Sequence, residues 1–104
     1  MSICSNSGSE ISLSEAQALV NAFKTRFPNE IKCSFVGVDT LNLILNQNDC
    51  IGVRIYNGYD TNLGRIAPVL IGVDSAGKDM STGVIIDKLK PCPDECDPTS
   101  PFHK

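Results

Sequence analysis

The reactive side chains of this sequence gather in the stretch KPCPDECDPTSPFHK, residues 90–104. This stretch holds Cys92, Cys96 and His103, the single histidine of the chain. Two cysteines and a histidine at short spacing suit a structural zinc site, thiol–disulfide exchange or a local disulfide. A further interpretation has both cysteines reduced, in a proline-stiffened tail that packs on the domain.

Spacing and charge rank these chemistries. A structural zinc site usually takes four ligands from two close pairs, and no second close pair accompanies Cys92 and Cys96. Acids at positions 94, 95 and 97 disfavour the thiolate that redox exchange needs. A Cys92–Cys96 disulfide is sterically allowed, and the reduced tail is favoured over it only narrowly. We therefore expect no bound metal and no cofactor.

Catalytic signals are absent elsewhere. His103 is the only histidine that could serve as a base for a nucleophile, and it lies close to a chain end. Capping and turn roles explain the aspartates that flank the predicted elements, which are Asp39, Asp60, Asp74, Asp79 and Asp87. The sequence also carries neither of the glycine-rich phosphate-binding motifs. We expect a protein that is not an enzyme.

A second group of polar residues lies on one hairpin arm. Arg54 and Tyr56 would share a strand face, and Tyr59 and Asp60 follow closely. Arginine and tyrosine are enriched at binding hot spots, which favours an interaction surface. The alternative is a solvated sheet face with a cross-strand salt bridge.

Two helices are predicted to position these residues. An apolar stripe with capping-box signals at Ser12 and Ser14 predicts a helix over about 14–27, ended by Pro28. The stripe is expected to be buried and consists of Leu13, Ala16, Leu19, Val20, Phe23 and Phe27. A shorter helix over 40–48 would have Asp39 as its N-cap.

Alternating and apolar runs predict strands. Residues 31–36 alternate, which places Cys33 in the core. The runs IGVRIYNGYD and RIAPVLIGVD form a hairpin around a turn with Gly64, and Pro68 should lie at a strand start or bulge. After the turn DSAGKD, the last strand is expected at 82–87. The class is α+β, with an antiparallel sheet of about four strands and two helices packed on one face.

Three stretches of the C-terminal half carry a resemblance. GVRIYNGYD, VLIGVD and CPDEC resemble the GxRIY, VLxGVD and terminal CPxxC stretches of a group of small bacterial proteins. No activity is assigned to that group, so the resemblance implies none. It implies only that the three stretches belong to one unit.

Length and composition bound the remaining classes. The 104 residues predict one domain, with an arm at 1–10, a globular core at 11–89 and a cysteine- and proline-rich tail at 90–104. A net charge of −3 without a basic cluster argues against nucleic acid. No signal peptide or membrane span is recognisable, so we expect synthesis in the cytoplasm, with the final location open.

These observations predict a non-enzymatic interaction module, or a self-assembling subunit that forms homo-oligomers or filaments through its terminal arms. The interaction residues would be Ile3, Arg54, Tyr56, Tyr59 and Phe102, with Ile3 and Phe102 as anchors. The alternative is a small metal- or thiol-dependent protein that uses Cys92, Cys96 and His103.

Overall fold

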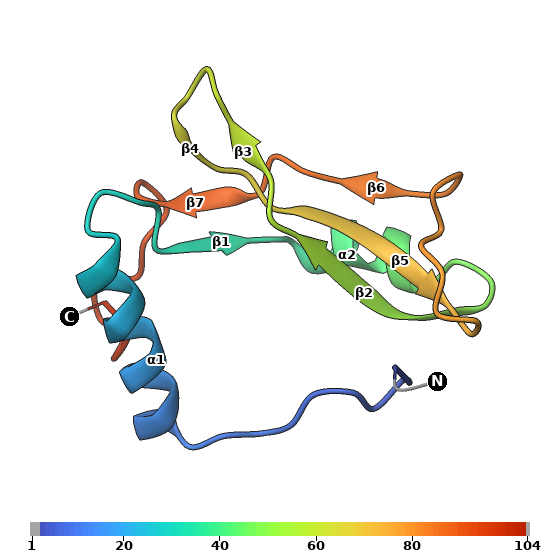
Figure 1. Cartoon of the computed structure of the whole chain (residues 1–104), viewed down its shortest axis with the longest axis horizontal. Helices are drawn as coiled ribbons and strands as arrows, with labels where there is room; N and C mark the ends of the chain where they lie inside the picture. The colour runs from blue at the N-terminus through green and yellow to red at the C-terminus, as the bar shows by residue number, and fades with distance from the viewer. Residues whose placement is uncertain (1–2, 104) are drawn as a thin grey trace. The chain divides into compact units, whose positions relative to one another are not determined.

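The computed structural model describes residues 3–103 (Figure 1). The first two residues of the predicted arm and the last residue of the predicted tail lie outside this range. Contacts divide the chain into two compact units. Unit 1 comprises the described residues of Met1–Ser7 together with Val36–Leu89, and unit 2 comprises Gly8–Phe35 with the described residues of Lys90–Lys104.

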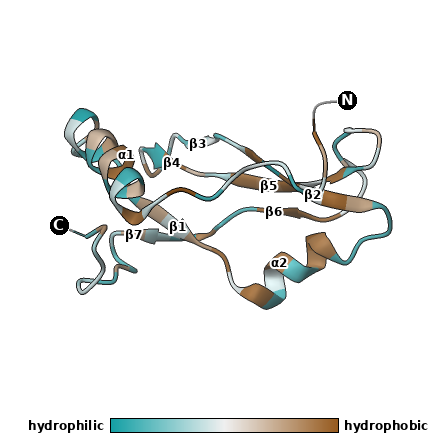
Figure 2. Cartoon of the chain, turned by 90° about the horizontal axis from the view of Figure 1, so that it is seen from below, coloured by the Kyte–Doolittle hydropathy of each residue, from teal (hydrophilic) through white to brown (hydrophobic). Residues whose placement is uncertain are grey.

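Unit 1 is built on a three-stranded antiparallel sheet. Strands β2 (Cys50–Tyr56), β5 (Val69–Asp74) and β6 (Ile85–Ile86) lie in the order β2-β5-β6. The predicted hairpin is confirmed, because β2 pairs with β5 in a register that sets Arg54 opposite Ile71 and Tyr56 opposite Val69. Hydrophobic residues predominate along β5 (Figure 2), which fits its central position between two strands.

Helix α2 (Val38–Leu45) covers one face of this sheet. Ile44 is fully buried and packs with Leu70 and Ile86, which forms the hydrophobic core of the unit. Gly72 lets the helix approach, since a Cβ built there would lie 2.9 Å from Gln47 Nε2 and 3.2 Å from Ile44 Cγ2. A side chain at this position would therefore push α2 away from the sheet.

The start of α2 differs from the prediction. The helix begins at Val38 with Gly37 as its N-cap, so the expected N-cap at Asp39 was wrong. Asp39 lies in the first turn, where a carboxylate interacts favourably with the positive end of the helix dipole. The sequence signal at Asp39 was therefore a first-turn preference rather than a capping preference.

The link between β2 and β5 forms a small hairpin of its own. Strands β3 (Tyr59–Asp60) and β4 (Arg65–Ile66) pair antiparallel, and Gly64 has a φ of +65°, as predicted. Asp60 Oδ1 accepts hydrogen bonds from the backbone N–H groups of Asn62 and Leu63 and so shapes the turn. The apolar run 65–74 is interrupted at 67–68, and Pro68 precedes the first residue of β5, as expected of a residue without an N–H group.

Unit 2 contains helix α1 (Leu13–Arg26) and two short strands. Of the two capping boxes predicted, the one at Ser12 is confirmed, because Glu15 N–H donates to Ser12 Oγ and Ser12 N–H donates to the Glu15 carboxylate; Ser14 lies inside the helix. The expected burial of the apolar stripe is wrong. No residue of α1 is buried, Leu19 is 67% exposed, and Phe23 is half-buried against the Phe27 ring, with ring centroids 5.1 Å apart.

The two strands of unit 2 change the predicted sheet. β1 (Cys33–Phe35) pairs antiparallel with β7 (Lys90–Cys92), a strand formed by the start of the predicted tail. Cys33 is exposed, so its predicted place in the core was wrong. Pro91 is compatible with the ladder because it pairs opposite Ser34 in a two-stranded ribbon, in which each strand has a free edge.

The α+β class is confirmed, but the single sheet of about four strands is not. The described residues form a three-stranded sheet and two separate two-stranded sheets. Residues 31–36 were expected to join the main sheet, and their partner is instead β7. The last strand is therefore β7, and the strand expected at 82–87 is reduced to Ile85–Ile86.

Candidate functional site

One candidate site lies on the sheet of unit 1. Arg54 and Tyr56, two residues apart on β2, both contact the carboxylate of Asp79. The turn at 74–78 brings Asp79 back alongside β5, where it forms a bridge with Val73. The sequence therefore located two members of a three-residue cluster. The expected alternative, a salt bridge across the sheet face, is present.

Mutual hydrogen bonding sets the charges of this cluster. The hydrogen bond from Tyr56, followed by that from Arg54, lowers the pKa of Asp79 below its ordinary value. The same contact with Asp79 raises the pKa of Tyr56 and that of Arg54. Asp79 is therefore held as a carboxylate and Tyr56 as a neutral phenol. Each of the three side chains forms a hydrogen bond with another member of the cluster. The cluster is therefore better suited to holding these side chains in place than to acid–base chemistry.

The remaining predicted residues of this hairpin have different environments. Tyr59 on β3 is 61% exposed and lies opposite Ile66. The Asp60 carboxylate accepts hydrogen bonds from backbone N–H groups of the turn that follows it. Ile55, a neighbour of both cluster residues on β2, is 63% exposed. The hairpin therefore also presents apolar and aromatic side chains to solvent, and Ile55 does so on the face opposite to Arg54 and Tyr56.

The N-terminal arm lies at the same strand. Ile3 and Cys4 of the arm line a hollow of about 400 Å³. Residues 51–55 of β2 and Val73 of β5 form other parts of its lining. The arm forms a tight turn, in which Ser7 N–H donates to the Cys4 carbonyl and Cys4 N–H donates to Ser7 Oγ. It adopts no strand between residues 3 and 10. The arm is therefore seated beside β2 without pairing with it.

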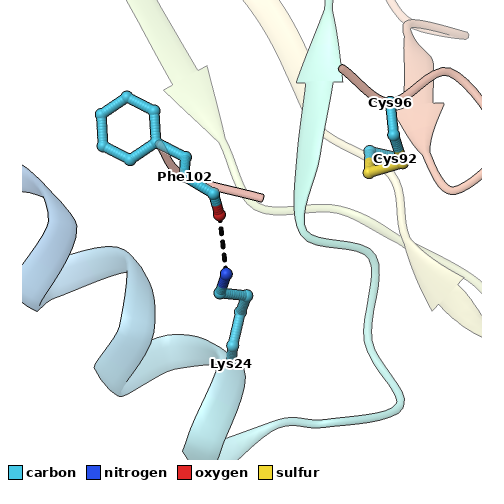
Figure 3. Close-up of a disulfide and its surroundings, with 4 residues drawn as sticks. All are labelled: Lys24, Cys92, Cys96 and Phe102. Atoms are coloured by element: carbon cyan, nitrogen blue, oxygen red, sulfur yellow. Dashed lines mark hydrogen bonds between the residues drawn. A yellow bond between two sulfur atoms is a disulfide. The ribbon is translucent and has the colours of Figure 1, made fainter. Parts of the chain in front are cut away.

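A second candidate site lies in unit 2, where Cys92 and Cys96 form a disulfide (Figure 3). Cys92 is 5% exposed. A cavity of about 220 Å³ is lined by Cys92 together with Cys33, Lys32, Phe102 and His103. The cavity therefore brings together Cys92 and His103, two of the three residues of the predicted metal- or thiol-dependent function. It also includes Cys33, which was predicted to lie in the core.

The tail is held against α1 by side-chain to carbonyl hydrogen bonds. Lys24 Nζ donates to the Phe102 carbonyl at 2.6 Å (Figure 3), and Gln17 Nε2 donates to the Pro101 carbonyl at 3.2 Å. Phe102 is 39% exposed. The hydrogen bonds from Thr99 lower the pKa of Asp97, so this carboxylate also has a local role in the tail. Phe102 thus contributes its backbone to the fold of unit 2.

No metal centre is formed within the described range. In residues 3–103, no group of three or more histidine, cysteine, aspartate or glutamate side chains is arranged to hold a metal ion. Nor does any helix in this range combine the length and the apolar character needed to cross a membrane.

Comparison with protein-family models, with curated proteins and with solved structures finds no match to this chain.

Two residues of the candidate sites, Asp79 and Cys33, were not among the predicted site residues. Asp79 had been assigned to a turn, but a hairpin that reverses at 74–78 returns it opposite Val73, on the face that carries Arg54. The length of this turn, and with it the position of Asp79 opposite Val73, could have been read from the sequence. Cys33 had no such signal, because its partner strand is more than fifty residues away.

Proposed function

We propose that this chain is a non-enzymatic protein-interaction subunit that assembles with further copies of itself through its N-terminal arm. The observation that carries the proposal is the outer edge of β2, which pairs with no strand among the described residues. An edge strand offers unpaired N–H and C=O groups to any extended segment that can reach it.

The composition of β2 supports this use of its edge. Protected edge strands commonly carry charged residues, above all lysine, or proline. The β2 sequence CIGVRIY has no lysine or proline, and its one charged residue, Arg54, is paired with Asp79. Its register is irregular only between Cys50 and Gly52, which leaves residues 53–56 regular. Ile55 on β2 and Tyr59 and Leu63 in the link after it are each more than half exposed, which adds apolar and aromatic surface near the strand. This surface would be covered in an assembly.

A second copy's arm is the occupant that the geometry favours. The arm already lies beside β2 within unit 1, with Ile3 lining the hollow, yet it makes no ladder there. An extended arm from a second copy would place its own Ile3 in the same hollow and add the backbone hydrogen bonds of a new strand. Gly8, with a φ of +98°, lies within the arm, after the turn at Cys4–Ser7, and gives the chain the freedom to redirect the residues before it.

The C-terminal tail is a weaker choice for this role. Its carbonyl groups at Pro101 and Phe102 accept hydrogen bonds from α1 of the same chain. A tail that left this position would lose both bonds, whereas the arm would keep the hydrogen bonds among Cys4, Asn6 and Ser7, which are internal to it. We therefore assign the connector role to the N-terminal arm.

Mass in solution tests the proposal. Light scattering over a range of protein concentrations should show a species heavier than the monomer. Ile3→Asp should abolish it because a carboxylate cannot replace the apolar side chain that Ile3 presents to Ile51, Val53 and Ile55 in the hollow. Ile11→Asp is the matched control, since Ile11 is also exposed, at 52%, but lies outside the arm and the hollow. A monomer at every concentration, or assembly that survives Ile3→Asp, would exclude arm-mediated assembly.

A further inference from the structure

The cavity of unit 2 contains a free thiol next to a disulfide. Cys33 on β1 carries an exposed thiol, and Cys92 on β7 is bonded to Cys96. Both Cys33 and Cys92 line the cavity of about 220 Å³. This arrangement is independent of the assembly proposed above, which uses the arm and β2.

The register of the two strands makes Cys33 and Cys92 direct partners. They are opposite each other in the antiparallel β1–β7 ladder, so both side chains point to the same face. Directly opposed residues in such ladders have Cα atoms about 4.5 to 5.5 Å apart. Disulfides take Cα separations of about 4.4 to 6.8 Å. The backbone therefore allows Cys92 to bond with Cys33 as well as with Cys96.

We propose that Cys33, Cys92 and Cys96 form a thiol–disulfide exchange site in which Cys92 alternates between two partners. The Cys33 thiol loses its proton to water, and the thiolate attacks Cys92 Sγ. The Cys33–Cys92 bond forms while the Cys92–Cys96 bond breaks. The electron pair leaves on Cys96 Sγ, which then takes a proton from water. One disulfide and one thiol exist before and after, so the step requires no oxidant or reductant.

Local charge favours the Cys92–Cys96 form at rest. Lys32, which lines the cavity with Cys33, brings a positive charge to this side of the site. Asp94, Glu95 and Asp97 surround Cys96 in the sequence, and acidic neighbours make its thiolate a poorer leaving group. The exchanged form is therefore the minor one, and it increases when the Cys96 thiol is trapped or removed.

The exchange changes what the disulfide connects. The Cys92–Cys96 bond closes a loop within the tail, with a sequence separation of four. A Cys33–Cys92 bond would instead join the two chain segments of unit 2, which are separated in sequence by the whole of Val36–Leu89. The exchange site thus provides a covalent lock on the β1–β7 pairing.

Disulfide mapping of a variant tests this proposal. Cys96→Ser leaves Cys92 without its local partner, and treatment with oxidised glutathione should then give a Cys33–Cys92 bond in most chains, detected by mass spectrometry of the digested protein. The matched control is Cys96→Ser combined with Cys33→Ser, in which Cys92 should carry glutathione instead. Circular dichroism confirms that both variants are folded.

A second measurement uses proteins that keep both Cys92 and Cys96. After equilibration and an acid quench, the fraction of chains with a free Cys96 thiol should fall at least about tenfold in Cys33→Ser, because attack by Cys33 is what releases Cys96. Cys50→Ser should leave that fraction unchanged. The proposal is overturned if Cys33 and Cys92 of Cys96→Ser remain free or carry only glutathione, or if they pair with Cys4 or Cys50.

Discussion

Unit 1 and unit 2 are stabilised in different ways. Five of the buried apolar side chains among the described residues belong to unit 1, which are Ile44, Leu70, Ile71, Val73 and Ile86. In unit 2 the buried side chain is Cys92, which carries the disulfide, and α1 has no buried residue. Unit 2 is connected by a three-residue ladder, a disulfide and side-chain to carbonyl hydrogen bonds.

This difference identifies the interactions on which each unit depends. Burial of apolar surface is the dominant favourable term in folding, so unit 1 should be sensitive to the volume of its core residues. Exposed hydrogen bonds contribute modestly, and a disulfide acts largely by restricting the unfolded chain. Unit 2 should therefore respond more to redox conditions than to truncation of its apolar side chains.

The largest expected effect is in the core of unit 1. Ile44→Ala should lower the free energy of unfolding by about 2 to 5 kcal/mol, because it leaves a cavity beneath α2 against Leu70 and Ile86. Urea unfolding followed by circular dichroism measures the loss. The control on the same helix is Val38→Ala, at a side chain that is 70% exposed, and its effect should stay within about 0.5 kcal/mol. Equal losses for the two variants would contradict a core centred on Ile44.

A smaller effect is expected on α1. Phe23 is half-buried and packs against the Phe27 ring, so Phe23→Ala should cost about 1 to 2 kcal/mol, less than the 3 to 5 kcal/mol of a fully buried phenylalanine. Leu19→Ala, at a side chain that is 67% exposed, serves as the control and should be nearly neutral. A cost for Phe23→Ala as large as that for Ile44→Ala would remove the distinction between the two units.

The smallest expected effect concerns acid stability. The pKa of Asp79 is lowered in the folded state, so its stabilising contribution is present above the pKa of an unfolded aspartate and is lost as pH falls through the folded pKa. Asp79→Asn should therefore flatten the decline in unfolding free energy between roughly pH 5 and pH 2. Thermal melts of both proteins across this range measure the slope. Parallel curves would mean that contacts with Tyr56 and Arg54 do not stabilise the carboxylate.

Local signals predicted much of this structure. The capping box at Ser12 and Glu15, the place of Pro68 at the start of β5 and the positive φ at Gly64 are each determined within a few residues. The β2–β5 pairing was also predictable, because alternating and apolar runs flank a turn. Such features depend on steric and hydrogen-bonding preferences that the sequence states directly.

Long-range choices were not predictable in this way. The strand at Cys33–Phe35 had several edges available to it, and its pairing with β7 joins residues far apart in the sequence. The exposure of the α1 stripe likewise follows from tertiary packing, since its periodicity predicts an apolar face without specifying what covers it. The residues of the candidate sites show the same difference between local and long-range signals. Arg54 and Tyr56 were found from local spacing, whereas Cys33 required the register of the β1–β7 ladder.

Native-state hydrogen exchange with and without reductant tests the distinction between the units most directly. The amides of Lys32 and Glu95 donate to the carbonyls of Cys92 and Pro91 in unit 2, and the amide of Met80 donates to the carbonyl of Gly72 in unit 1. Loss of a five-residue disulfide loop costs about 2 kcal/mol, equivalent to about a thirtyfold faster exchange. Reduction should accelerate Lys32 and Glu95 by about this factor and leave Met80 unchanged. Equal acceleration of all three amides, or of none, would contradict the account.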